Sequence, residues 1–128
     1  MNNLSNMSGN PVAETTAVDR SVLHAMSDGD VNTAREFIDL YQRLNNADLT
    51  NLKRAIAAAD QIGAIQASHR IVGASRTIGA IDLAAVCERI ECACRAGRWD
   101  EVNNSLPELQ NEITRVDAYL NSYLLDLK

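Results

Sequence analysis

Apolar residues recur every three or four positions along most of the chain, which is the spacing of one face of an α-helix. A short helix is expected over 18–26, and the Ser-Asp-Gly-Asp sequence at 27–30 signals a turn after it. The pattern then predicts a long helix over 31–56, in which the polar pair Asn45-Asn46 interrupts the periodicity and allows a kink. No alternating pattern of the kind found in strands competes with these helices.

Two further helices are expected on either side of Gly79. The first covers 61–78, and Gly79 has the position of a left-handed cap after it. Asp82 falls in the first turn of the second helix, which runs to the Gly97 stop signal. The short turn makes the two helices antiparallel neighbours. The expected buried residues are Ile62, Ile65, Ser68, Ile71, Val72, Ser75 and Ile78 on the first, and Leu83, Val86, Cys87, Ile90 and Cys94 on the second.

The last helix carries a heptad seam over 102–127. Its positions are Val102, Leu106, Leu109, Ile113, Val116, Leu120, Tyr123 and Leu127. Ser105 and Glu108 are expected to cap the main portion, with Pro107 in the first turn. The same seam could serve a coiled-coil dimer, but a helix inside a bundle shows the same repeat, so we expect a monomer.

These elements predict an all-α fold, an antiparallel four-helix bundle with a short accessory N-terminal helix. The bundle domain is expected over 18–127. Residues 1–17 are rich in Asn, Ser and Thr, and we interpret them as a flexible polar tail or linker.

Composition and charge argue against several classes of function. A net charge of −5 argues against a nucleic-acid surface, and no apolar run is long enough for membrane contact. The three cysteines, Cys87, Cys92 and Cys94, are an odd number in one short stretch, which favours a reduced, cytoplasmic compartment. Their spacings place them on different faces of one helix, so we expect no metal site there.

His69 is the strongest candidate for chemistry. It lies at the edge of an apolar stripe, and Gly73 follows one turn later on the same face, where it removes the side chain that would crowd the imidazole. Arg76 returns to the same line, and its guanidinium can reach back toward a group bonded to His69. Arg70 points about 100° away around the helix.

The segment over 28–127 resembles the histidine phosphotransfer (HPt) domain of bacterial multistep phosphorelays and hybrid sensor kinases. The resemblance rests on His69-Arg70-Ile71-Val72-Gly73-Ala74, followed by Gly79-Ala80, Leu83 and Ile90-Glu91. It implies that His69 accepts a phosphoryl group from a receiver-domain aspartate and passes it to another receiver. It also implies that Glu91 accepts a hydrogen bond from Nδ1 and orients the ring.

The implied partners are response-regulator receiver domains and a hybrid sensor histidine kinase. The chain has no Gly-rich phosphate loop and no kinase motif, so no ATP site and no cofactor are expected. The Mg²⁺ of the reaction would lie on the receiver. On this interpretation the protein is a phosphotransfer intermediate without kinase activity of its own.

One position departs from the family pattern. The lysine that the family often has three residues after the histidine is Val72 here, and Arg76 or Arg70 would have to replace its charge. An alternative function is therefore a docking bundle that binds a receiver or sensor kinase without accepting phosphate. A phosphohistidine phosphatase is disfavoured because no further acid, amide or metal cluster is evident near His69. His24 has no neighbouring glycine or basic partner of this kind and is not the expected phosphorylation site.

Overall fold

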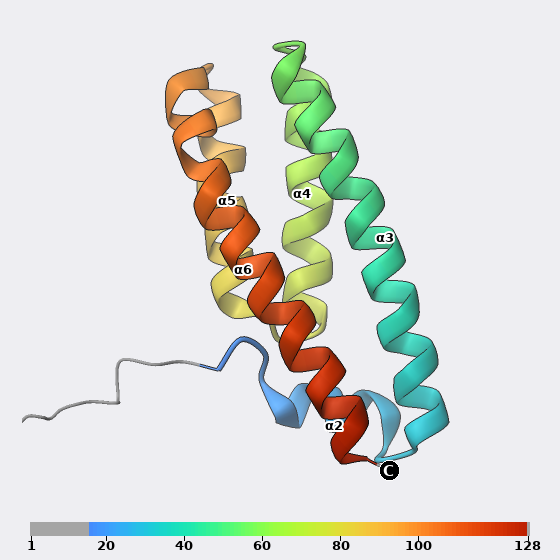
Figure 1. Cartoon of the computed structure of the whole chain (residues 1–128). Helices are drawn as coiled ribbons and strands as arrows, with labels where there is room; N and C mark the ends of the chain where they lie inside the picture. The colour runs from blue at the N-terminus through green and yellow to red at the C-terminus, as the bar shows by residue number, and fades with distance from the viewer. Residues whose placement is uncertain (1–15, 128) are drawn as a thin grey trace, which may run out of the picture.

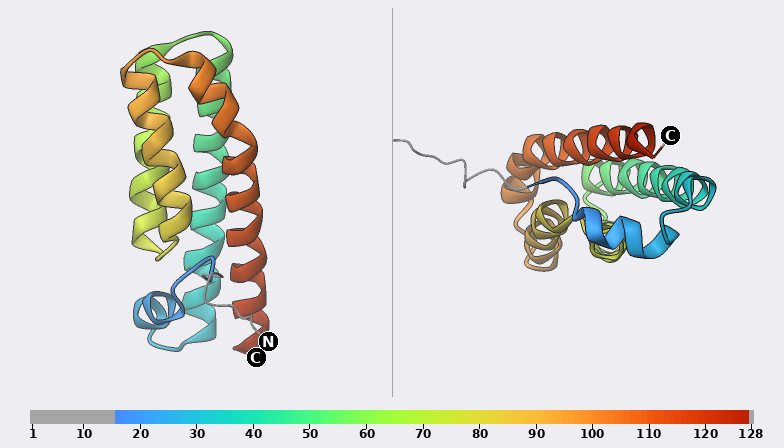
Figure 2. Two further views of the ribbon diagram at one scale, coloured as in Figure 1. Left: turned by 90° about the vertical axis from the view of Figure 1, so that its left-hand side faces the viewer. Right: turned by 90° about the horizontal axis from the view of Figure 1, so that it is seen from below.

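The computed structural model describes residues 16–127, which form five helices joined by short turns (Figure 1). The helices are α2 (Arg20–Ser27), α3 (Val31–Ala57), α4 (Gln61–Thr77), α5 (Ile81–Arg95) and α6 (Trp99–Asp126). Each long helix packs against the next, and α3 also packs against α6, which closes the bundle. The end-on view in Figure 2 shows the four long helices around one core, with α2 across the end. The predicted all-α bundle with an accessory helix is confirmed.

Aspartate side chains fix the starts of three helices. The carboxylates of Asp19, Asp30 and Asp60 accept hydrogen bonds from backbone N–H groups in the first turns of α2, α3 and α4, at 2.9–3.0 Å. Each such cap replaces a partner that the helix itself cannot provide and stabilises the start of the helix. The predicted turn before α3 is also present, with Asp28 and Gly29 at φ 52° and 75°.

The turn between α4 and α5 is where α2 meets the bundle. Gly79 has φ 81°, as a left-handed cap requires, and its carbonyl accepts a hydrogen bond of 3.0 Å from the backbone N–H of Asp19. A Cβ on Gly79 would stand 3.1 Å from the Cβ atoms of Asp19 and Val22. Both the backbone conformation and the approach of α2 therefore favour glycine here.

The described core includes one residue before the expected boundary at residue 18. Ala17 is buried and belongs to the core, as Val18 does. The rest of the expected tail, except Thr16, lies outside the described residues.

The core is built from the predicted faces of the long helices. Every residue expected to be buried on α5 is buried, and six of the eight seam positions on α6 are buried as well. The seam therefore packs against α3 and α5 of the same chain rather than remaining free for a coiled-coil partner. The buried seam residues are Val102, Leu109, Ile113, Val116, Leu120 and Tyr123, while Leu106 and Leu127 are partly buried.

The predicted start of the last helix is wrong. α6 begins at Trp99, and Pro107 lies inside it instead of in its first turn. Ser105 donates its hydroxyl to the Glu101 carbonyl, and Glu108 pairs with Arg89 at 2.6 Å, so neither residue acts as a cap. The physical reason is packing: Val102 is completely buried one turn before the expected cap, which favours helix on both sides of the exposed proline.

One position of the predicted α4 stripe is also wrong. Ile62 is 69 % exposed, and the buried face is continued toward the N-terminus by Ala64 and Ala67. Alanines at these positions allow the neighbouring helices to approach closely. Ile62 lies on the outer face of the helix, seven residues before His69. In α3, the helix is unbroken through the Asn45-Asn46 pair, and Asn45 is buried.

Candidate functional site

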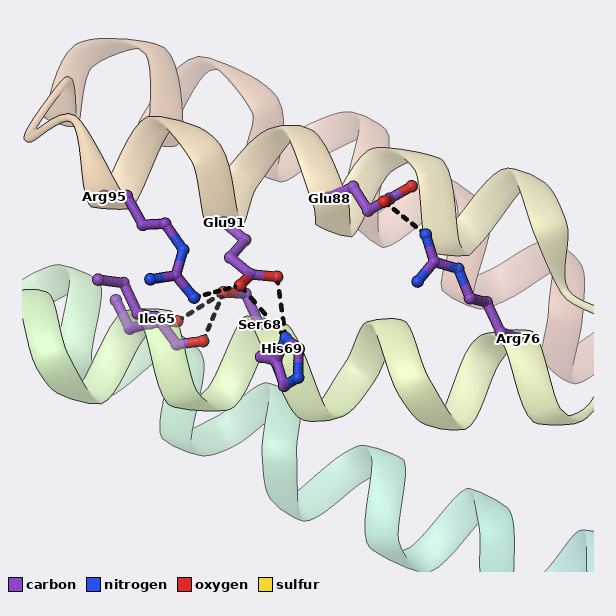
Figure 3. Close-up of polar contacts among 8 residues, drawn as sticks. Ile65, Ser68, His69, Arg76, Glu88, Glu91 and Arg95 are labelled. Atoms are coloured by element: carbon purple, nitrogen blue, oxygen red, sulfur yellow. Dashed lines mark hydrogen bonds and ion pairs between the residues drawn. The ribbon is translucent and has the colours of Figure 1, made fainter.

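His69 projects from the middle of α4 toward α5 (Figure 3). Its side chain is 71 % exposed, whereas the preceding residue, Ser68, is completely buried. The Ser68 hydroxyl donates to the Ala64 carbonyl at 2.7 Å, within the same helix. The edge of the buried stripe thus passes between two consecutive residues, as predicted. The imidazole is accessible, whereas the backbone of His69 belongs to the packed part of the bundle.

Glu91 of α5 contacts the inner nitrogen of this imidazole. Nδ1 of His69 lies 3.2 Å from Oε2 and 3.3 Å from Oε1 of Glu91. An ionised carboxylate only accepts hydrogen bonds, so Nδ1 must be the donor in this contact. In the neutral ring this tautomer leaves the lone pair on Nε2, which is free to act as a nucleophile. The contact expected from the family resemblance is therefore present.

Arg95, one turn after Glu91 on α5, binds the same carboxylate. Its Nη2 lies 2.7 Å from Oε2, the oxygen that is also closer to Nδ1 of His69. Partial burial opposes ionisation of Glu91, but the hydrogen bonds from Arg95 and His69 outweigh it, and the pKa of Glu91 lies below its ordinary value. Sequence reasoning missed Arg95. The four-residue spacing of an acid and a base on one helix was the available signal.

Gly73 leaves the face beyond His69 open. A Cβ built on this residue would meet nothing within 4 Å, so no neighbouring side chain requires a glycine. Gly63, the other glycine inside α4, differs because a Cβ there would clash with the Asp60 carboxylate that caps the helix. The interior glycine at position 73 has no structural reason within the described chain.

The two candidate arginines lie on opposite sides of His69, and each is bound to a carboxylate. Nη2 of Arg76 is 2.5 Å from Oε2 of Glu88 on α5 (Figure 3). Nε of Arg70 is 2.9 Å from Oδ1 of Asp48 on α3. The structure thus brings Glu91 to His69 and places Arg76 on the same α5-facing side, whereas Arg70 faces α3.

Val72, the residue in place of the family's lysine, is 3 % exposed and belongs to the core. The aliphatic side chain contributes to packing between the helices, and it offers no charge to the surface around His69. Val72 therefore does not supply the charge that the resemblance assigns to the family's lysine.

An apolar groove that the sequence did not reveal runs between α3 and α4. It forms a cavity of about 150 Å³, and Leu40 and Leu44 on its rim are 45 % and 55 % exposed. Thr77 lies about 80° around α4 from His69 and close to the line of Arg70, so the groove opens on the α3 side of α4 and not on the face that carries the imidazole. Ile81, at the start of α5, is 61 % exposed. The groove is lined by Phe37, Leu40, Tyr41, Leu44, Ala74, Thr77 and Ile78.

The histidine and cysteine side chains outside this site lie on α2 and α5. Among residues 16–127, no group of three or more His, Cys, Asp or Glu side chains could hold a metal ion. Cys87 and Cys94 are buried, as predicted, and only Cys92 of the three thiols is exposed. His24 lies on α2, and its ring stands beside Gly29. No helix in the described part of the chain has the length and apolar character of a membrane span.

A family model, a curated protein and a solved structure resemble this chain. Residues 36–119 match the family model of the Hpt domain. The chain is 28 % identical over 109 residues to the phosphorelay intermediate protein rdeA of Dictyostelium discoideum. This match covers 85 % of the chain but only 43 % of that protein, so the chain spans less than half of its relative's length. The crystal structure of histidine-containing phosphotransfer protein B (HptB) from Pseudomonas aeruginosa PAO1 superposes with a TM-score of 0.80 at 19 % identity, covering 88 % of this chain and 98 % of that one.

Proposed function

The chain belongs to the Hpt domain family, and we propose that it carries a phosphoryl group on Nε2 of His69 between receiver domains. The observation that supports this most directly is the pairing of an exposed imidazole with a fixed acceptor at its other nitrogen. Glu91 holds Nδ1, and the 71 % exposed side chain leaves Nε2 accessible to a partner. The match to a phosphorelay intermediate protein points in the same direction.

In the proposed reaction, the Nε2 lone pair attacks the phosphorus of an aspartyl phosphate on a receiver. The N–P bond forms as the P–O bond to the aspartate breaks, and the aspartate leaves as a carboxylate. The ring keeps its Nδ1 proton and becomes positively charged, so the Glu91 carboxylate stabilises it. Transfer to a second receiver reverses these steps. Phosphoryl transfer depends mainly on positioning and charge stabilisation, which the Mg²⁺ and acidic residues of the receiver would largely supply.

Gly73 and two arginines are the candidates for contact with the transferred group. Gly73 leaves room for it, and Arg76 lies on the same side of α4 as Glu91. We expect Arg76 to exchange its partner, Glu88, for the phosphoryl oxygens during transfer, because a guanidinium binds a doubly charged phosphoryl group more strongly than an exposed carboxylate. Arg70 is the second candidate, but it would have to leave Asp48 on the other side of the helix.

The receiver would dock on the apolar surface beside His69. Ile62, two turns before His69 on the same face of α4, and Ile81, at the start of α5, are exposed. The occupant must bring an aspartate to Nε2, so its apolar contacts have to lie within reach of His69. Because relay partners separate after transfer, we expect a small interface of less than about 1,200 Å² in total. A hybrid sensor histidine kinase would supply the first receiver.

The experiment that tests this function is transfer of label from a phosphorylated receiver. The purified domain is incubated with the receiver and Mg²⁺, as wild type and as His69→Gln, and acid-labile, alkali-stable label is followed. We expect label on the wild type and none on His69→Gln.

The alternative, a docking bundle without phosphate transfer, is favoured by one observation: Val72 is buried, and both nearby arginines are bound to carboxylates. A folded wild type that binds receivers but takes no label from a panel of them would support this alternative and contradict the proposed transfer.

A further inference from the structure

We propose that Arg95 is a positioning residue for phosphotransfer, which holds the Glu91 carboxylate and through it keeps Nε2 of His69 as the free nucleophile. This inference rests on the proposed function of His69 and adds a residue to it. Arg95 does not touch the imidazole, so its effect must pass through Glu91.

The geometry of the carboxylate carries the argument. Oε2 of Glu91 lies between two donors, Nη2 of Arg95 at 2.7 Å and Nδ1 of His69 at 3.2 Å. The Glu91 side chain is only 13 % exposed, whereas those of Arg95 and His69 are 58 % and 71 % exposed. The shorter bond, to a permanently charged guanidinium, is the stronger of the two. It restricts the torsions of Glu91 and fixes the direction in which the carboxylate meets Nδ1.

The backbone of Arg95 is itself held in place from α4. Nε2 of Gln61, the first residue of α4, donates to the carbonyl oxygens of Cys94 at 2.9 Å and Arg95 at 3.1 Å. These carbonyls belong to the last turn of α5, and that of Cys94 also accepts a hydrogen bond of 3.1 Å from the backbone N–H of Gly97, just beyond the helix. His69 also lies on α4. The bond from Gln61 therefore fixes the base of the Arg95 side chain relative to the helix that carries the nucleophile.

An acid–base pair spaced by four residues on a helix surface can also be a purely stabilising ion pair. The two roles differ in what they predict for the imidazole. A stabilising pair would affect only unfolding, whereas a positioning pair would change the proportion of the two ring tautomers in the folded protein. Arg89 provides the matched control, because it lies on the same helix, is 53 % exposed and binds Glu108 at 2.6 Å without contacting Glu91.

The test compares wild type with Arg95→Met, Arg95→Lys and Arg89→Met. Nitrogen-15 NMR of the folded proteins in alkaline buffer measures the fraction of His69 with the proton on Nδ1, and His24 in the same spectra is the internal reference. The rate of phosphorylation by phosphoramidate, a small donor that needs no docking surface, is followed by phosphorus-31 NMR.

For Arg95→Met we expect a smaller Nδ1–H fraction and phosphorylation slower by about three- to fivefold, the size of effect that an exposed ion pair can exert. Arg95→Lys should recover most of both, and Arg89→Met should match wild type. A tautomer ratio and rate in Arg95→Met that equal those of Arg89→Met would overturn the proposal. The tautomer measurement uses unphosphorylated protein, so it decides the role of Arg95 even if receivers fail to transfer phosphate and the proposed function is wrong.

Discussion

Gly73 follows His69 by one helical turn, and a side chain at position 73 would find open space out to 4 Å. Glycine in the interior of a helix costs about 1 kcal/mol relative to alanine. Gly63 of the same helix has a packing reason, since a Cβ there would clash with the capping carboxylate of Asp60. No packing contact in the described part of the free protein explains the destabilising glycine at position 73. This points to a partner that must approach the imidazole.

Replacing Gly73 should therefore separate stability from function. Gly73→Ala is expected to increase the free energy of unfolding by about 0.5–1 kcal/mol, measured by urea denaturation. Gly73→Leu should also fold, but its longer side chain would stand beside His69 and slow transfer from a receiver by about tenfold or more. Phosphorylation by phosphoramidate serves as the control and should change less. A Gly73→Leu protein that accepts phosphate from receivers at the wild-type rate would contradict the need for access.

The ion pair between Arg76 and Glu88 predicts opposite effects for its two members. If Arg76 stabilises the phosphorylated state, Arg76→Gln should shorten the lifetime of phosphohistidine by about threefold. Glu88→Gln removes the competing carboxylate, so the lifetime should stay the same or become longer. Arg70→Gln is the comparison on the other side of the helix, and we expect a smaller effect. The lifetime is measured from loss of acid-labile label. Equal shortening by Arg76→Gln and Glu88→Gln would show that only the ion pair matters.

Periodicity alone predicted the helices of the bundle and most of their buried faces, because an apolar stripe can be buried only against neighbouring helices. It failed at Pro107 and Ile62, where the outcome depends on tertiary packing: Val102 is buried and extends α6 toward Trp99, and Ala64 and Ala67 replace Ile62 at the helix contact. The position of Glu91 opposite His69 followed from the family resemblance. The carboxylate partners of Arg70 and Arg76 could not be predicted, because Asp48 and Glu88 meet them from other helices.

The three thiols should differ sharply in reactivity. Cys92 is exposed, whereas Cys87 and Cys94 are buried, and burial raises the pKa of Cys87 to about 12 and also raises that of Cys94. The thiolate is the reactive form, so buried thiols with a raised pKa react slowly. A thiol reagent at neutral pH should modify one cysteine in the native protein and three after denaturation. Cys92→Ser should abolish the fast reaction. Rapid modification of more than one thiol in the native state would show that α5 opens readily.

Pro107 should destabilise the folded protein. A proline inside a helix lacks the N–H that would bind the carbonyl four residues earlier, and its ring crowds that turn. Because Pro107 is exposed, its replacement leaves no cavity. We expect Pro107→Ala to increase the free energy of unfolding by about 1–3 kcal/mol. Asn104→Ala, an exposed position of the same helix, controls for helix propensity and should gain less than about 0.7 kcal/mol. A gain at Pro107 no larger than that of the control would mean that α6 already accommodates the proline without strain.

The charge of Glu91 should make the free energy of unfolding depend on pH. Its pKa in the folded state lies below the ordinary value of 4.5, because the hydrogen bonds from Arg95 and His69 outweigh the opposing effect of partial burial. A lowered pKa means that the carboxylate stabilises the fold above the unfolded pKa, and that this contribution disappears as the pH falls through the folded pKa. The difference in unfolding free energy between wild type and Glu91→Gln should therefore be larger at about pH 7 than at a pH below the folded pKa, where wild type also becomes neutral at this position. Urea denaturation at the two pH values measures it, and a difference that does not change with pH would show that the Glu91 charge is not stabilised in the fold.

In transfer assays, Glu91→Gln keeps an oxygen acceptor for Nδ1 and should retain part of the activity. Glu91→Leu keeps none, and we expect it to lose about tenfold or more, the value of one charge-assisted hydrogen bond.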